Sequence, residues 1–375
     1  MPETPASSDA ERPIGRFITE KVLPVWDEMN TFERLRVHSH AVPAALTRSR
    51  VRTHRFPEHW AAYLYNGKIA GGQYGRLTSL VSSQAAEACT SKWLTRQYME
   101  AAGLPVPEYH SFSSDQRDDA LVIVRQPGQD WVLRPDAARH GQGVTLHLTE
   151  EDFPEAWKQA TEARPAGSDP THQILLEPFH DALPLRIFVV GSRVAAAAVR
   201  VPLFVVGDGV STVDQLLEAS FAHRQQHVLL RRTLPEISAE LLSRRAPRLS
   251  DVPADGTLHV LSDDGGLHRG GLPYDATDIV CEELKQLAVG AAESVPGLAA
   301  AAVDLLTPEL SSAEGAVVLD TDAWASLLMH RYPAFGSPRP VALALAELIR
   351  LRAEHWERVT LPAAMAPSAG SGEDD

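Results

Sequence analysis

Three aspartates are the first residues in the chain with the types and spacing that chemistry needs. Asp304 lies inside the apolar run of residues 300–306, and Asp320 and Asp322 follow the apolar run of residues 316–319. Because side chains two residues apart on a strand point to the same face, Asp320 and Asp322 are expected to lie together. Carboxylate oxygens suit Mg²⁺, which takes few carboxylates together with phosphate oxygens and waters. A single strand-end aspartate is more often a solvated turn former, but the combination of three favours a metal site.

A glycine pair supplies the complementary half of a phosphate site. Gly141 and Gly143 flank Gln142 between two extended runs. Such a hinge lets backbone N–H groups approach phosphates and lets the segment fold over them. Arg134, just before the loop, can neutralise phosphate charge. Most Gly-x-Gly pairs are ordinary hairpin turns, so this pair indicates a phosphate loop only together with the aspartates.

Composition and missing motifs exclude several classes of function. The 375 residues, 44% of them hydrophobic, can build two or three domains, and the net charge of −14 argues against a nucleic-acid or anionic-membrane partner. Cys89 and Cys281 lack the spacing of a zinc ribbon or a disulfide framework. The sequence contains no P-loop, no full G-x-G-x-x-G after a first strand and no G-x-S-x-G elbow. With no apolar run of about 18 residues, a cytoplasmic enzyme is expected.

The apolar pattern and the turn residues predict a mixed α/β or α+β fold. A helix is expected to begin after a cap at Thr90 or Ser91 and to stop at Gly103, and Gly191-Ser192 is expected to close a β-hairpin. Further helices are predicted after Asp152, after Ser211 or Thr212, from Asp278 and over residues 341–356. Strands are predicted over residues 131–134, 144–148, 174–177, 185–190, 193–199, 300–306 and 316–319.

Several motifs follow one another in a fixed order. They are Ser91-Lys92, AAGLPVP, WVLRPDAARHGQGV, ILLEPF, LRIFVVGSRVAAAAVRVPLFVVGDGVSTVDQLLE, GGLPYDATD, AVDLL and VVLDTDAWASLLMHRYPAFGSPR. This order resembles the ATP-grasp region of cyanophycin synthetases and is similar to related glutathione-synthetase-like peptide ligases. The resemblance covers residues 84–352, and its most specific pieces are residues 206–212 and 329–339.

The resemblance implies an ATP-grasp fold, in which an N-terminal α/β domain precedes two lobes that clasp ATP. The expected divisions are a disordered tail (1–15), an N-terminal domain (16–88), a connecting helix (89–103), a lid subdomain (104–178), a catalytic subdomain (179–358) and a second disordered tail (359–375).

Carried over by position, the resemblance also implies a role for individual residues. The ATP group comprises Lys92, Arg134, Gly141, Gln142, Gly143, Glu177, Pro178, Phe179 and Asp181. The family has a ribose-binding acid where this chain has Pro184, and Asp181 is the expected substitute. The metal ligands are Asp304, Asp320 and Asp322, with two Mg²⁺ ions expected and Mn²⁺ as an alternative. The catalytic group comprises Arg186, Arg200 and His330, with a structural role for His330 left open. The substrate group comprises Asp208, Gly209, Gly270, Gly271, Arg331 and Arg339.

The chain departs from the family pattern in several places. Arg134 stands where the family has lysine, which keeps the charge in a forked form. Asp320 and Asp322 replace the glutamate and asparagine of a Glu-x-Asn metal motif. An arginine and an asparagine of the family are missing from residues 261–271, and the second, Mur-like ligase module is absent. We therefore expect a stand-alone relative with its own substrates.

The expected reaction is the ATP-dependent activation of a carboxylate as an acyl phosphate, which an amine of an amino acid or short peptide then attacks. One alternative is a non-catalytic ATP-grasp nucleotide-binding module, which the departures at Arg134 and Asp322 favour. Another is an ATP-grasp phosphotransferase, or a ligase that forms a thioester or ester. The expected partners are a small carboxylate and an amine, without nucleic acid or membrane. A homo-oligomer, dimer or tetramer, is expected by family analogy.

Overall fold

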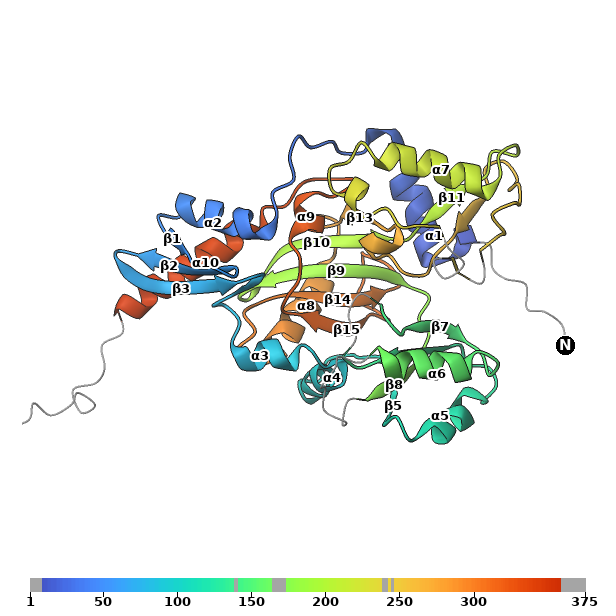
Figure 1. Ribbon diagram of the computed structural model, residues 1–375, viewed down its shortest axis with the longest axis horizontal. Helices are drawn as coiled ribbons and strands as arrows, with labels where there is room; N and C mark the ends of the chain where they lie inside the picture. The colour runs from blue at the N-terminus through green and yellow to red at the C-terminus, as the bar shows by residue number, and fades with distance from the viewer. Residues whose placement is uncertain (1–8, 138–140, 164–172, 238–241, 244–245, 359–375) are drawn as a thin grey trace, which may run out of the picture.

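An antiparallel five-stranded sheet lies at the centre of the molecule (Figure 1). The computed structural model describes residues 9–137, 141–163, 173–237, 242–243 and 246–358. The strand order is β13-β10-β9-β14-β15. The strands are β9 (Leu183–Val190), β10 (Arg193–Val201), β13 (Leu272–Asp275), β14 (Ala300–Thr307) and β15 (Val317–Asp322). As predicted, Gly191 and Ser192 close the β9–β10 hairpin, with Gly191 at φ +62°.

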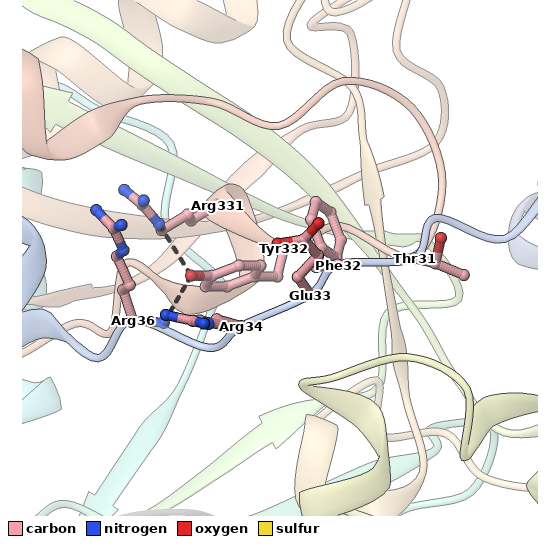
Figure 2. Close-up of a pocket in the computed structure, with 7 residues that line it drawn as sticks. All are labelled: Thr31, Phe32, Glu33, Arg34, Arg36, Arg331 and Tyr332. Atoms are coloured by element: carbon pink, nitrogen blue, oxygen red, sulfur yellow. Dashed lines mark hydrogen bonds between the residues drawn. The ribbon is translucent and has the colours of Figure 1, made fainter.

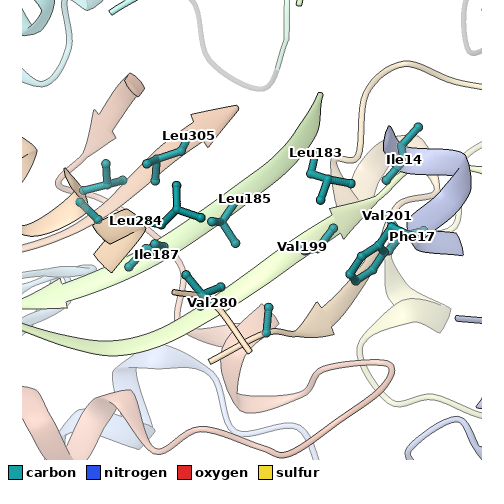
Figure 3. Packing of buried hydrophobic residues seen from close by; sticks show 14 of the residues in the cluster. Ile14, Phe17, Leu183, Leu185, Ile187, Val199, Val201, Val280, Leu284 and Leu305 are labelled. Atoms are coloured by element: carbon teal, nitrogen blue, oxygen red, sulfur yellow. The ribbon is translucent and has the colours of Figure 1, made fainter. Parts of the chain in front are cut away.

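One face of this sheet carries the main hydrophobic core. Leu183, Leu185 and Ile187 alternate along β9, and Val199 and Val201 alternate along β10, so all five point to the same side and are buried (Figure 3). Helix α8 (Glu282–Ser294) packs against this face. The residues between them, including Arg186 and Arg200, therefore point to the opposite face.

The N-terminal segment is folded onto this core. It consists of η1 (Asp9–Glu11), α1 (Pro13–Phe17), η2 (Ile18–Val22) and η3 (Leu23–Glu28). Ile14, Phe17, Ile18 and Val22 are buried in the same cluster as β9 and β10. The expected disordered tail is therefore wrong for residues 9–15, because this apolar stripe has a partner far away in the sequence. Residues 1–8 and 359–375, the rest of the two predicted tails, lie outside the described residues.

A second antiparallel sheet lies at the end of the molecule opposite α1, on the left in Figure 1. Its strands are β1 (Arg52–Arg55), β2 (Trp60–Tyr65), β3 (Lys68–Tyr74) and β4 (Leu77–Thr78), and it packs with α2 (His38–Arg48) and α10 (Val341–Arg358). The expected single N-terminal domain over residues 16–88 is therefore wrong. Residues 16–28 pack on the core of the central sheet, whereas residues 38–78 pack against α10.

The third sheet has a core of its own. Its strands, in the order β5-β8-β6-β7, are β5 (His110–Phe112), β6 (Trp131–Pro135), β7 (Thr145–Leu148) and β8 (Ile174–Pro178). Helix α5 (Arg117–Val124) packs on it through Ala120 and Val124, and helix α6 (Phe153–Glu162) packs on it through Phe153 and Trp157. Two helices, α3 (Ser83–Ala88) and α4 (Lys92–Ala101), precede it in the chain. The predicted cap of α4 is confirmed, since the Ser91 hydroxyl accepts a hydrogen bond from the Leu94 N–H.

The remaining elements surround the central sheet. They are β11 (Phe204–Val206), α7 (Val213–Arg224), η4 (Leu230–Arg232), β12 (Leu258–Val260), η5 (Leu267–Arg269) and α9 (Leu328–Arg331). The helix expected from Asp278 is present, but its predicted start is wrong. Helix α8 begins at Glu282, and Asp278 instead accepts a 2.6 Å hydrogen bond from Arg339 Nη2. No helix in the described part of the chain is long and apolar enough to cross a bilayer.

Thr212 begins α7 with a reciprocal cap, as predicted. Its hydroxyl accepts a hydrogen bond from the Gln215 N–H, and the Gln215 side chain accepts one from the Thr212 N–H. Thr212→Ala is expected to lower the free energy of unfolding by about 1 kcal/mol, because it leaves one helix-terminal N–H without its partner. Urea denaturation measures this loss, and an equal loss for Ser192→Ala in the exposed hairpin turn would contradict the assignment to the cap.

Candidate active site

A charged row crosses the face of the central sheet that lies opposite the main hydrophobic core. Arg186 on β9 donates two hydrogen bonds to Asp304 on β14, from Nε to Oδ1 at 2.7 Å and from Nη2 to Oδ2 at 2.7 Å. Arg186 Nη1 also lies 3.6 Å from Asp322 Oδ2, and Arg200 Nη2 lies 3.6 Å from Asp304 Oδ1. The structure therefore brings together both arginines predicted to be catalytic and two of the aspartates that the sequence singles out.

The strand register explains this arrangement. Asp304 is directly opposite Arg186 on β9 and directly opposite Asp320 on β15. Cross-strand partners share a face, so Arg186, Asp304 and Asp320 form one line across three strands. Asp322 is two residues further along β15 and lies on the same face, as its spacing predicts.

The electrostatics of the row differ from one aspartate to the next. Burial opposes ionisation of Asp304, but the arginines Arg186 and Arg200 outweigh it and hold its pKa well below the usual range. Burial raises the pKa of Asp320 to about 6; Lys92 opposes this shift, whereas the carboxylates of Asp304 and Asp322 add to it. In the fold, Asp320 is therefore harder to ionise than a free aspartate, mainly because it is buried.

These carboxylates fit a magnesium–phosphate site rather than an all-protein metal cage. In the described part of the chain, no group of three or more His, Cys, Asp or Glu side chains is arranged to hold a metal ion. Mg²⁺ usually takes one or two carboxylates and completes its shell with phosphate oxygens and water. The oxygen donors of the row, and the raised pKa of Asp320, suit an ion of that kind.

The third sheet brings positive charge to the same place. Arg134 on β6 contributes to the lowered pKa of Asp304, and Lys92 at the start of α4 acts on Asp320. Lys92 Nζ also donates a 3.1 Å hydrogen bond to the Asp136 carbonyl. Both predicted phosphate-binding cations therefore face the aspartate row across the space between the two sheets.

Glu177 on β8 holds Arg134 in this position. Glu177 is 2% exposed, and its Oε1 lies 2.8 Å from Arg134 Nε while its Oε2 lies 2.6 Å from Arg96 Nη2. Burial opposes ionisation of Glu177, but Arg134 and Arg96 outweigh it and lower the pKa. The sequence reasoning missed Arg96, which is 0% exposed. The sequence did offer a signal for Arg96: it lies four residues after Lys92, and residues at this spacing share one side of a helix.

The predicted glycine loop is described in part. Gly141 and Gly143 have φ values of +74° and +68°, which favour glycine, and Gln142 between them is exposed. A Cβ on Gly143 would lie 2.8 Å from the Ala163 Cβ, so the loop passes close to the end of α6. Residues 138–140, just before it, lie outside the described residues.

A charged junction connects the third sheet, Asp263 in the loop after β12 and the N-terminal segment. His147 on β7 makes hydrogen bonds to Asp130 through Nδ1 at 2.6 Å and to Asp263 through Nε2 at 3.1 Å. Arg12 donates to Asp263 at 3.1 Å and to Asp181 at 3.0 Å. Asp181, the predicted ribose-binding acid, is therefore an ion-pair partner of Arg12. Pro178 is the last residue of β8 and Phe179 follows it; the centroid of the Phe179 ring lies 4.2 Å from that of the His147 ring.

Known proteins share this architecture. No protein-family model matches the chain. Cyanophycin synthetase of Nostoc sp. (strain PCC 7120 / SAG 25.82 / UTEX 2576) is 29% identical over 283 residues, which cover 73% of this chain and 30% of that protein. The glutathione biosynthesis bifunctional protein GshAB of Pasteurella multocida (strain Pm70) is 26% identical over 289 residues, which cover 73% of this chain and 37% of that protein. This chain is a homologue of both. It spans about a third of the length of these curated relatives.

A solved structure confirms the fold. The crystal structure of a bifunctional glutathione synthetase from Pasteurella multocida matches with a TM-score of 0.54 and 23% identity, over 83% of this chain and 43% of that chain. The predicted α/β ATP-grasp fold and the resemblance to cyanophycin synthetases and glutathione-synthetase-like ligases are therefore confirmed.

The predicted substrate-facing residues are less closely connected to the aspartate row. Asp208 accepts hydrogen bonds from the Val210 and Ser211 N–H groups and so shapes its own turn, in which Gly209 has a φ of +72°. Gly270 has a φ of +79°, and a Cβ on Gly271 would lie 2.2 Å from the Gly265 carbonyl oxygen.

Two arginines of the substrate group have different surroundings. Arg339 is held by Asp275 at 2.6 Å and by Asp278, so it ties residues 275–278 to the C-terminal part of the chain. Arg331 lines a surface pocket (Figure 2). Within the described residues, no hydrogen bond or ion pair connects any of the six predicted substrate residues to Asp304, Asp320 or Asp322.

His330 lies beside the row but is poorly placed to shuttle protons. It is 1% exposed, and neither ring nitrogen has a hydrogen-bond partner among the described residues. Its ring centroid is 6.1 Å from that of Phe188. Burial, with Arg186 adding to it, lowers the pKa of His330 to about 3. The ring is therefore neutral near pH 7 and a weak base.

The charged junction predicts a pH effect on stability. Burial alone would lower the pKa of His147, but hydrogen bonds to Asp130 and Asp263 outweigh it and raise the pKa. The imidazolium therefore stabilises the fold fully below the unfolded pKa of about 6.5, and this contribution is lost as the pH rises through the raised value. Between pH 6 and pH 9, the wild type is expected to lose more unfolding free energy than His147→Gln does. Equal losses would contradict this, and His355→Gln, at an exposed position on α10, is the control.

Proposed function

We propose that this protein is an ATP-dependent, ADP-forming ligase that joins a carboxylate to an amine through an acyl phosphate. The carbonyl carbon loses its phosphate when the amine attacks, and an amide or peptide bond forms. The observation that carries the proposal is the row of Arg186, Asp304 and Asp320 on the central sheet, together with the positive charges of Arg134 on β6 and Lys92 on α4 that act on it. Homology to cyanophycin synthetase and GshAB supports it.

The proposed division of the chain follows the sheets. Residues 104–178 form the lid, residues 89–103 connect it, and residues 179–358 form the catalytic body. ATP binds between lid and body, with Lys92 and Arg134 on its phosphates and the backbone of residues 177–179 at the adenine. The loop of Gly141 and Gly143 covers the phosphates and excludes the water that would hydrolyse an acyl phosphate.

Asp304, Asp320 and Asp322 are the proposed ligands of two Mg²⁺ ions, for which Mn²⁺ is the alternative. When bound, these ions neutralise phosphate charge and polarise the γ-phosphoryl group. Arg186 and Arg200 add fixed positive charge where negative charge develops during phosphoryl transfer. The water-poor face of the sheet strengthens these interactions.

A substrate screen tests the proposal. The protein with Mg²⁺ and ATP is incubated with amino acids and short peptides, and phosphate release and product masses are measured. We expect ADP, phosphate and an amide, and hydroxylamine should trap the activated acid as a hydroxamate. A hydroxamate without an amide product would indicate a thioester- or ester-forming enzyme. Calorimetry that finds no Mg²⁺-dependent nucleotide binding would rule the proposal out.

One observation favours a second candidate, a non-catalytic nucleotide-binding module. Arg186 donates hydrogen bonds to both oxygens of Asp304 at 2.7 Å, so its guanidinium already neutralises this carboxylate and competes with a metal ion for it. Mg²⁺-dependent ATP binding without ADP release from any substrate would favour this module.

We further propose that the protein is cytoplasmic and forms a homo-oligomer, dimer or tetramer. Size-exclusion chromatography with light scattering tests the oligomeric state.

A further inference from the structure

A pocket lined by three arginines lies beside α9, and the proposed reaction does not use it. Its volume is about 630 Å³, it is open to solvent, and Arg34, Arg36, Arg331 and Tyr332 are among its lining residues. Figure 2 shows the three arginine side chains at the hydroxyl end of the Tyr332 ring, with Glu33 toward the other end. Within the described residues, none of these arginines forms an ion pair with a carboxylate.

The hydroxyl of Tyr332 is oriented by its neighbours. It accepts hydrogen bonds from the Arg36 backbone N–H at 2.7 Å and from Arg331 Nε at 3.1 Å. A phenolic oxygen has two acceptor positions and one proton to donate. Because both acceptor positions are used, the proton of Tyr332 is free to point to a ligand. The pocket thus offers one hydroxyl donor together with guanidinium N–H groups.

The pocket is held in shape by aromatic contacts. Tyr332 is 4% exposed, and the Phe32 ring packs edge-on against it with centroids 5.0 Å apart. Phe32 also contacts the ring of His227, with centroids 5.3 Å apart. These contacts fix the segment of residues 31–36 on α9, so the arginines do not have to be gathered when a ligand arrives.

The segment of chain that begins with the pocket residues has the opposite charge to the whole protein. Residues 31–78 are rich in basic side chains although the chain carries a net charge of −14. The basic residues of this segment are Arg34, Arg36, Arg48, Arg50, Arg52, Arg55, Lys68 and Arg76, against the acidic residues Glu33 and Glu58. The charge of this segment therefore favours an anion over a cation as a ligand near Arg34 and Arg36.

The position of the pocket connects it to the reaction. His330 and Arg331 are neighbours in α9; His330 packs against Phe188 beside Arg186, and Arg331 lines the pocket. We propose that the pocket binds an oxyanion, a carboxylate or a phosphate, which one of the two substrates carries away from its reacting group. The pairing of guanidinium groups with such oxyanions is strong and directional. The identity of the carrier rests on the proposed function, whereas oxyanion binding itself does not.

Isothermal titration of the full chain at low salt, without nucleotide, tests the binding. Glutarate and inorganic phosphate are the two probes, and the tighter one identifies the source of the oxyanion. Arg34→Gln and Arg36→Gln are each expected to weaken its binding by about tenfold or more, because each removes a charge-assisted hydrogen bond. The control is Arg193→Gln at the exposed start of β10, expected to change binding less than twofold. The proposal is wrong if neither probe binds at millimolar concentrations, or if the control loses as much.

A second measurement separates this inference from the proposed function. Phosphate release is measured for the same variants with the substrates that the wild type uses. We expect Arg36→Gln to raise KM for the anion-carrying substrate at nearly constant kcat. Oxyanion binding in a protein without ligase activity would contradict the proposed function but not the proposed oxyanion site. An active ligase whose KM values do not change in Arg34→Gln and Arg36→Gln would contradict the proposed role of the pocket but not the proposed function.

Discussion

Asp320→Asn is expected to slow ADP release by about a thousandfold or more. The variant removes a carboxylate from the proposed magnesium–phosphate site, and a metal ion supplies several kcal/mol of charge stabilisation in phosphoryl transfer, at about 1.4 kcal/mol per factor of ten. Initial rates of ADP release with saturating Mg²⁺ and ATP measure the effect. A variant that keeps full activity would remove Asp320 from the metal site.

The same substitution is expected to leave the metal-free protein at least as stable as the wild type. Burial raises the pKa of Asp320 to about 6, so the folded state disfavours the carboxylate more than the unfolded chain does. This destabilisation is present in full above pH 6 and vanishes below the unfolded pKa of about 3.9. Melting temperatures in EDTA should therefore be higher for Asp320→Asn at pH 8 and equal to those of the wild type near pH 3.5. Asp27→Asn, at an exposed position, serves as the control for both activity and melting.

Glu177→Gln is expected to lower the free energy of unfolding by about 3–5 kcal/mol, because it leaves Arg96 buried without a counter-charge. The guanidinium of Arg96 is 0% exposed and lies 2.6 Å from the Glu177 carboxylate. The pKa of Glu177 is lowered in the fold, so its contribution is present above the unfolded value of about 4.3 and is lost as the pH falls. Urea denaturation at pH 7 and at pH 4 should therefore show a smaller difference at pH 4.

Two comparisons make this prediction specific. Glu282→Gln breaks an exposed pair with Lys285, whose closest atoms are 3.8 Å apart, and should cost less than about 1 kcal/mol. The double variant Glu177→Leu with Arg96→Met should lose less than the sum of its single variants, since it removes both buried charges together. A fully additive loss would show that Arg96 and Glu177 do not act as a pair.

Local signals in the sequence predicted much of the fold. The caps at Ser91 and Thr212, the turn at Gly191 and the two aspartate-bearing strands depend on neighbours a few residues away, and the structure confirms them. The alignment of Arg186 with Asp304 depends on the register between β9 and β14. That register could not be read from local pattern, and the arginines were assigned by resemblance.

Long-range pairing explains what the sequence reasoning missed. Arg12 and Arg96 look like surface cations in the sequence, yet both are buried by partners far along the chain, Asp263 and Glu177. The residues around Arg12 are polar and acidic, which is why they were interpreted as a tail. The start of the helix expected at Asp278 was misplaced for the same reason, since Arg339, far along the chain, binds that carboxylate.

The N-terminal segment limits the order in which a newly made chain can assemble. Its apolar side chains pack onto β9 and β10, and they are Ile14, Phe17, Ile18 and Val22. The ribosome makes this segment early, but its partners follow only after residues 183–201 have emerged. At 5–20 residues per second, this delay is on the order of ten seconds or more. During that time four apolar side chains have no native surface to cover them, so this segment is where we expect chaperones to bind the nascent protein first.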